Sequence, residues 1–253
     1  MRISVCIDAL FDEWEPGRAL EAVSAAGLDA FEFWGWAGRD VAQLDRERRR
    51  LGLSVHALCT RKVSLTDPVR RADYLQGLKD SLPIAERLGA RLLITQVGDE
   101  IPGASRDAQR RSIVDGLRAC VPALEGAGVT LLVEPLNTAV DHPGYFLSSS
   151  QEAFSILADV GSPWVQLLFD IYHQQVTEGN LLESIRAHIH KIGHFHAAGV
   201  PGRHELSGGE LDYRAIFRAI DGMGYEGRIG FEYFPLRDPV EGLASWAALA
   251  KGG

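Results

Sequence analysis

Short apolar runs alternate with longer helical patterns eight times along this chain, and this alternation constrains the fold more than any other feature. The runs predict strands at 2–7, 29–33, 53–58, 91–96, 129–134, 165–170, 191–196 and 228–232. Most are apolar throughout, which is typical of parallel strands covered on both faces. The stretches between them, such as 73–89 and 110–128, have helical spacing and end in glycine, a common helix stop.

Eight strand–helix units in 253 residues give about 32 residues per unit, which is the size that a closed (β/α)8 barrel needs. An open doubly wound sheet is the alternative, but it usually has fewer strands, and no GxGxxG fingerprint follows the first strand here. No linker or low-complexity segment divides the chain. We therefore predict an α/β fold, a TIM barrel that forms a single domain over residues 1–253.

Composition narrows the function classes. The chain has 26 basic and 34 acidic residues, a net charge of −8, which opposes binding to a polyanion such as nucleic acid. Its three cysteines form no CxxC pair, which favours a reducing compartment. We find no signal-peptide pattern and no apolar run near the roughly 18 residues of a membrane span. We expect a cytoplasmic protein without nucleic-acid or membrane partners; a homo-oligomer is compatible with the sequence.

Four consecutive predicted strands end on side chains that can bind a metal ion. These residues, separated by 36, 26 and 36 positions, are Glu134, Asp170, His196 and Glu232. In a TIM barrel, the carboxyl ends of the strands form the active-site face. One such acid alone could equally cap a helix or pair with an arginine, but burying several like charges together is costly without a cation. We predict one divalent ion, Mg²⁺ or Mn²⁺, with Co²⁺ or Zn²⁺ also compatible.

Other polar residues fall on the same predicted face. The candidates for substrate binding are His173, Arg203, His56, Trp34 and Glu205. His56 could instead be a core histidine, and Trp34 could be ordinary loop packing. The glycine-rich loop at 199–210 could close over a substrate or form a rigid turn. His194 points to the same side as His196 by strand alternation but should lie deeper in the barrel.

Long segments of the second half resemble a known family. "VEPLNTAVDHPGYFLSSSQEA" (133–153), "FDIYHQQVTEGNL" (169–181), "AGVPGRHELSGGELDY" (198–213) and "GFEY" (230–233) occur in that order. They are similar to the hydroxypyruvate isomerase family of the xylose isomerase-like TIM barrels, the sugar isomerase and epimerase superfamily. Relatives of hydroxypyruvate isomerase often carry glutamine at the position of His196. The histidine of this chain is instead similar to that of ketose 3-epimerases. A basic residue is usual where this chain has Ala139 and Val140.

The resemblance implies an intramolecular isomerase that uses a divalent metal and a small-molecule substrate. Hydroxypyruvate would become tartronate semialdehyde through an enediolate, with Glu134 and Glu232 as catalytic proton carriers that also bind the metal. His173 and Arg203 would hold the substrate. The alternatives are a ketose 3-epimerase, an isomerase of 2-oxo-tetronate or another sugar acid, and a non-catalytic sugar-binding barrel. Endonuclease IV of the same superfamily needs a histidine at the end of strand four, where this chain has Gln96.

Overall fold

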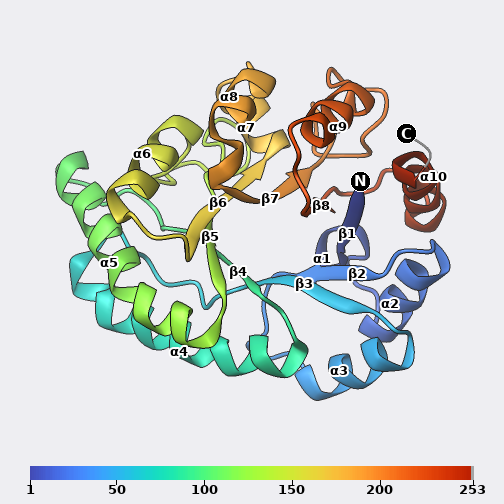
Figure 1. Ribbon diagram of the computed structural model, residues 1–253, viewed down its shortest axis with the longest axis horizontal. Helices are drawn as coiled ribbons and strands as arrows, with labels where there is room; N and C mark the ends of the chain where they lie inside the picture. The colour runs from blue at the N-terminus through green and yellow to red at the C-terminus, as the bar shows by residue number, and fades with distance from the viewer. Residues whose placement is uncertain (252–253) are drawn as a thin grey trace.

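The computed structural model describes residues 1–251 and forms a closed barrel of eight parallel strands surrounded by helices (Figure 1). Each strand pairs with the next along the chain, and β8 closes the barrel against β1. The strands are β1 Arg2–Cys6, β2 Ala30–Phe33, β3 Ser54–Cys59, β4 Leu92–Thr95, β5 Thr130–Val133, β6 Val165–Asp170, β7 Ile192–Ala197 and β8 Arg228–Phe231. The predicted TIM barrel is confirmed, and every predicted strand matches within one residue at each end.

Helices follow the strands and cover the outside of the barrel (Figure 1). The longer ones are α2 Pro16–Ala25, α3 Val41–Arg50, α4 Arg71–Leu88, α5 Arg106–Ala127, α6 Ser150–Val160, α8 Leu181–His188, α9 Tyr213–Gly222 and α10 Pro239–Lys251. Short helices α1 Ile7–Leu10 and α7 Ile171–Thr177 begin directly after β1 and β6, and the 3-10 turns are η1 Pro68–Arg70 and η2 Ile189–Lys191. Serine or aspartate side chains cap several helix starts; at α5, Ser105 accepts a hydrogen bond from the Ala108 amide.

The barrel interior is divided into an apolar part and a polar part. On β3 to β6, the inward side chains form a small buried cluster of Ala57, Ile94, Leu132 and Leu168. Their neighbours along the strands belong to the large core between strands and helices, as the two-residue period of a strand requires. On β1, β2, β7 and β8, the interior instead holds Ser4, Glu32, His194 and His196 around Gly230. The polar part lies on the side of the barrel that carries the candidate site.

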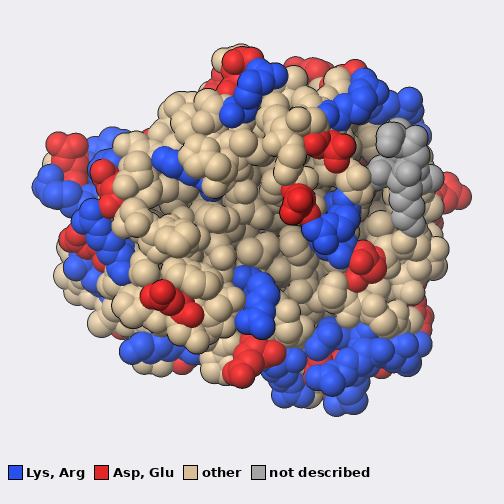
Figure 2. Space-filling view, viewed as in Figure 1, with Lys and Arg blue, Asp and Glu red and all other residues tan. Residues whose placement is uncertain are grey.

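On the face shown in Figure 2, charged side chains of both signs gather mainly around the edge, over the helices. The middle of this face is formed largely by residues that are neither basic nor acidic. Among the described residues, no helix is both long enough and apolar enough to span a membrane.

Candidate metal centre

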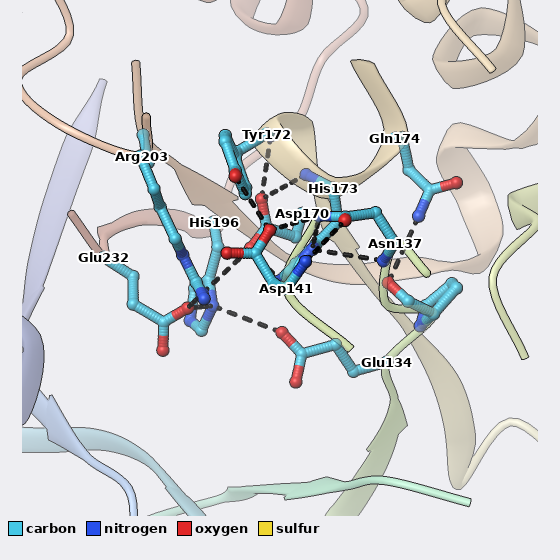
Figure 3. A network of polar contacts seen from close by, with 12 residues as sticks. Glu134, Asn137, Asp141, Asp170, Tyr172, His173, Gln174, His196, Arg203 and Glu232 are labelled. Carbon is cyan, nitrogen blue, oxygen red and sulfur yellow. Dashed lines mark hydrogen bonds and ion pairs between the residues drawn. The ribbon is translucent and has the colours of Figure 1, made fainter. Parts of the chain in front are cut away.

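The structure brings together the four predicted metal ligands, Glu134, Asp170, His196 and Glu232, which we call the ligand cluster (Figure 3). Each offers one ligand atom, and these atoms all lie within 4.8 Å of one another. Asp170 and His196 belong to the ends of β6 and β7, while Glu134 and Glu232 directly follow β5 and β8. All four side chains are buried. The parallel strands therefore place their carboxyl-end residues at one point, as the sequence predicts.

Each carboxylate of the ligand cluster has one oxygen held by a donor outside the cluster. Gln96 donates to Oε2 of Glu134 at 2.9 Å, and the indole of Trp34 donates to Oε1 of Glu232 at 2.6 Å. Oδ1 of Asp170 accepts hydrogen bonds from the backbone N–H groups of Tyr172 and His173 at the start of α7, as a helix cap does. The second oxygen of each carboxylate faces the centre of the cluster, and that of Glu232, Oε2, also accepts from Arg203.

His196 follows the same pattern. Its Nε2 lies 3.0 Å from Glu32, while its Nδ1 lies 3.4 Å from Oε2 of Glu232 and 3.7 Å from Oε1 of Glu134. Among the described residues, neither Nδ1 of His196 nor Oδ2 of Asp170 has a hydrogen-bond partner, although both atoms are buried. Unsatisfied buried polar atoms are costly, and a cation among them would satisfy them together. The donor set, three carboxylates and one imidazole, fits a divalent ion.

The electrostatics of the ligand cluster favour competition between protons and a metal. Burial by itself would lower the pKa of His196, but Glu232 and Glu32 outweigh it and raise that pKa well above the usual value. Burial raises the pKa of Asp170 to about 7, with Arg203 and His196 opposing the shift. Burial would likewise raise the pKa of Glu232, but His196 and Arg203 outweigh it and leave that pKa below its usual value. A metal bound here would have to displace protons from His196 and Asp170, so its affinity would rise as the pH rises through 7.

Arg203 reaches into the ligand cluster from the loop after β7 (Figure 3). Its guanidinium pairs with Glu232 and lies 3.7 Å from Oδ2 of Asp170. The aromatic rings of Tyr172 and Phe234 lie 5.5 Å and 5.6 Å from its Cζ. This buried arginine, with two aromatic rings nearby, balances part of the acidic charge, and a guanidinium has the donor geometry that matches an anionic group.

The loop that carries Arg203 is folded tightly on itself. The Gly199 amide donates to the His204 carbonyl at 2.8 Å, and the Arg203 amide donates back to Gly199 at 2.9 Å. A Cβ on Gly199 would lie 2.2 Å from the Glu205 carbonyl oxygen, so only glycine permits this approach. Between the two possibilities that the sequence left open, this geometry favours a rigid turn that fixes Arg203.

His173 supplies a second polar group to the site. Its Nδ1 lies 3.2 Å from the backbone amide of Asn137, which can only donate. The ring proton must therefore sit on Nε2, which faces Oδ2 of Asp170 at 3.6 Å and has no hydrogen-bond partner among the described residues. Burial and the charge of Arg203 lower the pKa of His173 well below its usual value. His173 is thus a neutral donor directed into the site.

Two predicted substrate-binding residues take other places, and a third, Trp34, contacts one member of the ligand cluster. His56 packs against His194, with ring centroids 4.6 Å apart, and lies below the strand ends. Glu205 accepts hydrogen bonds from the amides of Leu236 and Arg237, and so ties together the loops after β7 and β8. The indole of Trp34 donates to Glu232 and so lies beside the ligand cluster. The structure therefore brings His173 and Arg203 to the cluster, and it does not bring His56 or Glu205 there.

Sequence reasoning assigned no role to Gln96, Asn137 or Glu32, which each hold a residue of the site in place. Gln96 directly follows β4, so the same inspection of strand ends that found the ligands could have found it. Asn137 lies three residues after Glu134, in the first of the segments that resemble the family. Glu32 contacts His196 across a separation of 164 residues, which no local pattern reveals.

Comparison with known proteins agrees with this geometry. The family model of the xylose isomerase-like TIM barrels matches residues 20–249. A putative hydroxypyruvate isomerase of Homo sapiens is 34% identical over 262 residues, covering 97% of this chain and 94% of that protein. A 2-oxo-tetronate isomerase of Cupriavidus necator is 36% identical over 176 residues, covering 70% of this chain and 67% of that protein.

Among solved structures, one described as an AP endonuclease of family 2 from Brucella melitensis superposes with a TM-score of 0.92. It is 28% identical to this chain, and the match covers 98% of each chain. The family model, the full-length relative and the barrel with its strand-end acids all lead to one assignment. This chain belongs to the xylose isomerase-like TIM barrel family and, within it, to the hydroxypyruvate isomerase-like enzymes, which are keto–aldehyde isomerases.

Proposed function

We propose that this isomerase interconverts hydroxypyruvate and tartronate semialdehyde, a small 2-keto acid and its aldehyde isomer, with the help of one divalent ion. One observation carries the proposal. The buried atoms of the ligand cluster that lack hydrogen-bond partners converge beside Arg203. A position for a metal ion and an arginine that could bind a substrate carboxylate therefore lie within one buried site. The names of the relatives support the same class of reaction.

Glu134, Asp170, His196 and Glu232 would hold the ion, which Mg²⁺ or Mn²⁺ suits best and Co²⁺ or Zn²⁺ also fits. When bound, it supplies Lewis-acid polarisation of the neighbouring hydroxyl and carbonyl oxygens of the substrate. The chain itself fixes the direction of each ligand, because Gln96, Trp34, Glu32 and the start of α7 hold the atoms that face away from the centre.

The side chains around the centre would bind the substrate and move its proton. Arg203 would grip the carboxylate of hydroxypyruvate with two parallel hydrogen bonds. His173 would donate from Nε2 to a substrate oxygen. A carboxylate from the pair Glu134 and Glu232 removes a proton from C3, and a proton returns to C2 of the enediolate, while the hydroxyl proton passes from O3 to O2. The product has the same atoms as the substrate, so no oxidant or reductant is needed.

A second candidate is an isomerase of 2-oxo-tetronate or a 3-epimerase of a free ketose. The Cupriavidus necator relative is named for the first of these reactions, and His196 matches the histidine that ketose 3-epimerases carry. Both alternatives would use the same proton chemistry. They differ in the substrate: 2-oxo-tetronate keeps the carboxylate that Arg203 would bind, and a ketose lacks it.

The test is a comparison of substrates on Mn²⁺-loaded protein, followed by proton NMR. We expect hydroxypyruvate to give tartronate semialdehyde with a higher kcat/KM than 2-oxo-tetronate, and free ketoses to react least. Asp170→Asn, purified in the same way, should lose this activity and so excludes a contaminating enzyme. Faster epimerisation of a ketose than isomerisation of either acid would contradict the proposal, as would cleavage of abasic DNA without any isomerase activity.

A further inference from the structure

A second buried polar cluster lies beneath the metal ligands, in the polar part of the barrel interior. Its centre is Glu32 on β2, which is 1% exposed. Nε2 of His194 lies 2.9 Å from Oε1 of Glu32, and Nε2 of His196 lies 3.0 Å from Oε2. The hydroxyl of Ser4 also donates to Oε1. The mechanism proposed above gives Glu32 no contact with the substrate.

The hydrogen-bond partners assign the protons in this cluster. An ionised carboxylate only accepts, so each histidine must donate to Glu32 through Nε2. For His194 the other nitrogen, Nδ1, lies 3.1 Å from the carbonyl oxygen of Arg228, which also only accepts. Both ring nitrogens of His194 therefore face acceptors, Oε1 of Glu32 and the Arg228 carbonyl. Oε2 of Glu32 remains as the acceptor for His196.

This assignment decides which nitrogen of His196 can bind a metal. A neutral imidazole carries one proton, and here Glu32 holds that proton on Nε2. The lone pair then lies on Nδ1, the atom that faces Glu134 and Glu232 and that has no partner among the described residues. The opposite tautomer would direct an N–H at the position of the ion.

We propose that Glu32 is a positioning residue that fixes the tautomer and the ring orientation of His196, so that Nδ1 is presented to the divalent ion. The inference rests on the metal site proposed above. It adds the residue that makes the imidazole of His196 able to bind the ion through Nδ1. Carboxylates behind metal-bound histidines raise the basicity of the ring, and their loss typically lowers metal affinity about 10–100-fold.

Gly230 on β8 provides an independent sign that the barrel is built around this arrangement. A Cβ at this position would lie 2.6 Å from Oε1 of Glu32 and 2.6 Å from Cδ2 of His196. Real Cβ atoms do not approach other atoms so closely, and both neighbours are buried side chains with little room to move. The missing side chain thus leaves the space in which Glu32 and His196 meet.

The inference is tested by measuring Mn²⁺ affinity, from the EPR signal of free Mn²⁺, for three variants and the wild type. Glu32→Leu removes the acceptor and should weaken binding about 10–100-fold. Glu32→Gln should bind within a few-fold of the wild type, because the amide oxygen can accept from His196, while His194 can keep its proton on Nδ1, donate it to the Arg228 carbonyl and accept from the amide nitrogen at Nε2. Ser4→Ala, the matched control, keeps both histidine contacts and should leave the affinity unchanged.

The outcomes separate this inference from the proposed function. If the wild type binds no Mn²⁺, the metal site and the inference both fail. If the wild type binds Mn²⁺ and Glu32→Leu binds it equally well, or if Gln and Leu weaken binding to the same extent, only the role of Glu32 is overturned.

Long-range ¹H–¹⁵N spectra of the wild type loaded with Zn²⁺ read the tautomer directly and do not depend on a variant that folds. His196 is assigned from the signal that is lost in His196→Gln. We expect its proton on Nε2; a proton on Nδ1 would overturn the inference.

Discussion

Glu134→Gln is expected to lower kcat for hydroxypyruvate by about 10²–10⁴-fold, the usual contribution of a group that moves a proton in the transition state. Mn²⁺ affinity should fall much less, because the amide oxygen of glutamine can still face the centre of the ligand cluster. Gln96, which donates to Oε2 of Glu134 at 2.9 Å, can turn its own amide to match the new side chain. Steady-state kinetics at saturating Mn²⁺, with the affinity measured separately, give both quantities.

Glu210→Gln makes the same chemical change on an exposed position of the loop after β7 and serves as the control. It should leave kcat and metal affinity unchanged. A Glu134→Gln protein that loses Mn²⁺ binding, yet recovers full kcat when enough Mn²⁺ is added, would show that Glu134 only binds the metal. Retained activity without added metal would contradict both roles.

Arg203→Ala is expected to raise KM for hydroxypyruvate by about 30-fold or more, since truncating one member of a buried charge pair costs about 2 kcal/mol or more. The side chain is buried near two aromatic rings, and its guanidinium pairs with Glu232 of the ligand cluster. Lysine at this position keeps the charge but loses the two-pronged geometry, so Arg203→Lys should recover only part of the loss. Initial rates over a range of substrate concentrations measure the effect.

A neutral ketose provides the comparison within the same variant, because it has no carboxylate for Arg203 to bind. Its kinetics should change much less than those of the acid. Arg237→Ala removes the same charge from an exposed position on the loop after β8, and it should behave as the wild type. Equal losses of kcat/KM for the acid and the ketose would mean that Arg203 supports the structure of the site and does not bind the substrate carboxylate.

The fold was predictable from the sequence because a barrel of this kind needs eight buried strands at a regular spacing, and both features are visible locally. The ligand cluster was predictable for a related reason. Parallel strands end on one face, so an inspection of their last residues identifies side chains that meet in space, such as Asp170 and His196, which are paired directly across β6 and β7. No alignment of distant segments is needed for that step.

Depth within the barrel was not predictable in the same way. His56 is the third residue of β3, and the strand continues to Cys59, so its side chain lies below the mouth. The register between β2 and β3 also shifts at Phe31 and Glu32, which no local pattern indicates. The position of Glu205 depends on a loop that folds back on itself and reaches the segment after β8. Such contacts are set by packing between distant segments.

The central claim is that one divalent ion, held by the ligand cluster, supports isomerisation of a small keto acid. Its most direct test is a titration of metal-stripped protein with Mn²⁺ at pH 8, where fewer protons compete for His196 and Asp170. Activity on hydroxypyruvate should be absent after stripping with EDTA, should rise in proportion to added Mn²⁺, and should stop rising at one equivalent per chain. Full activity in the stripped protein, or no activity at any level of Mn²⁺, Mg²⁺, Co²⁺ or Zn²⁺, would contradict the claim.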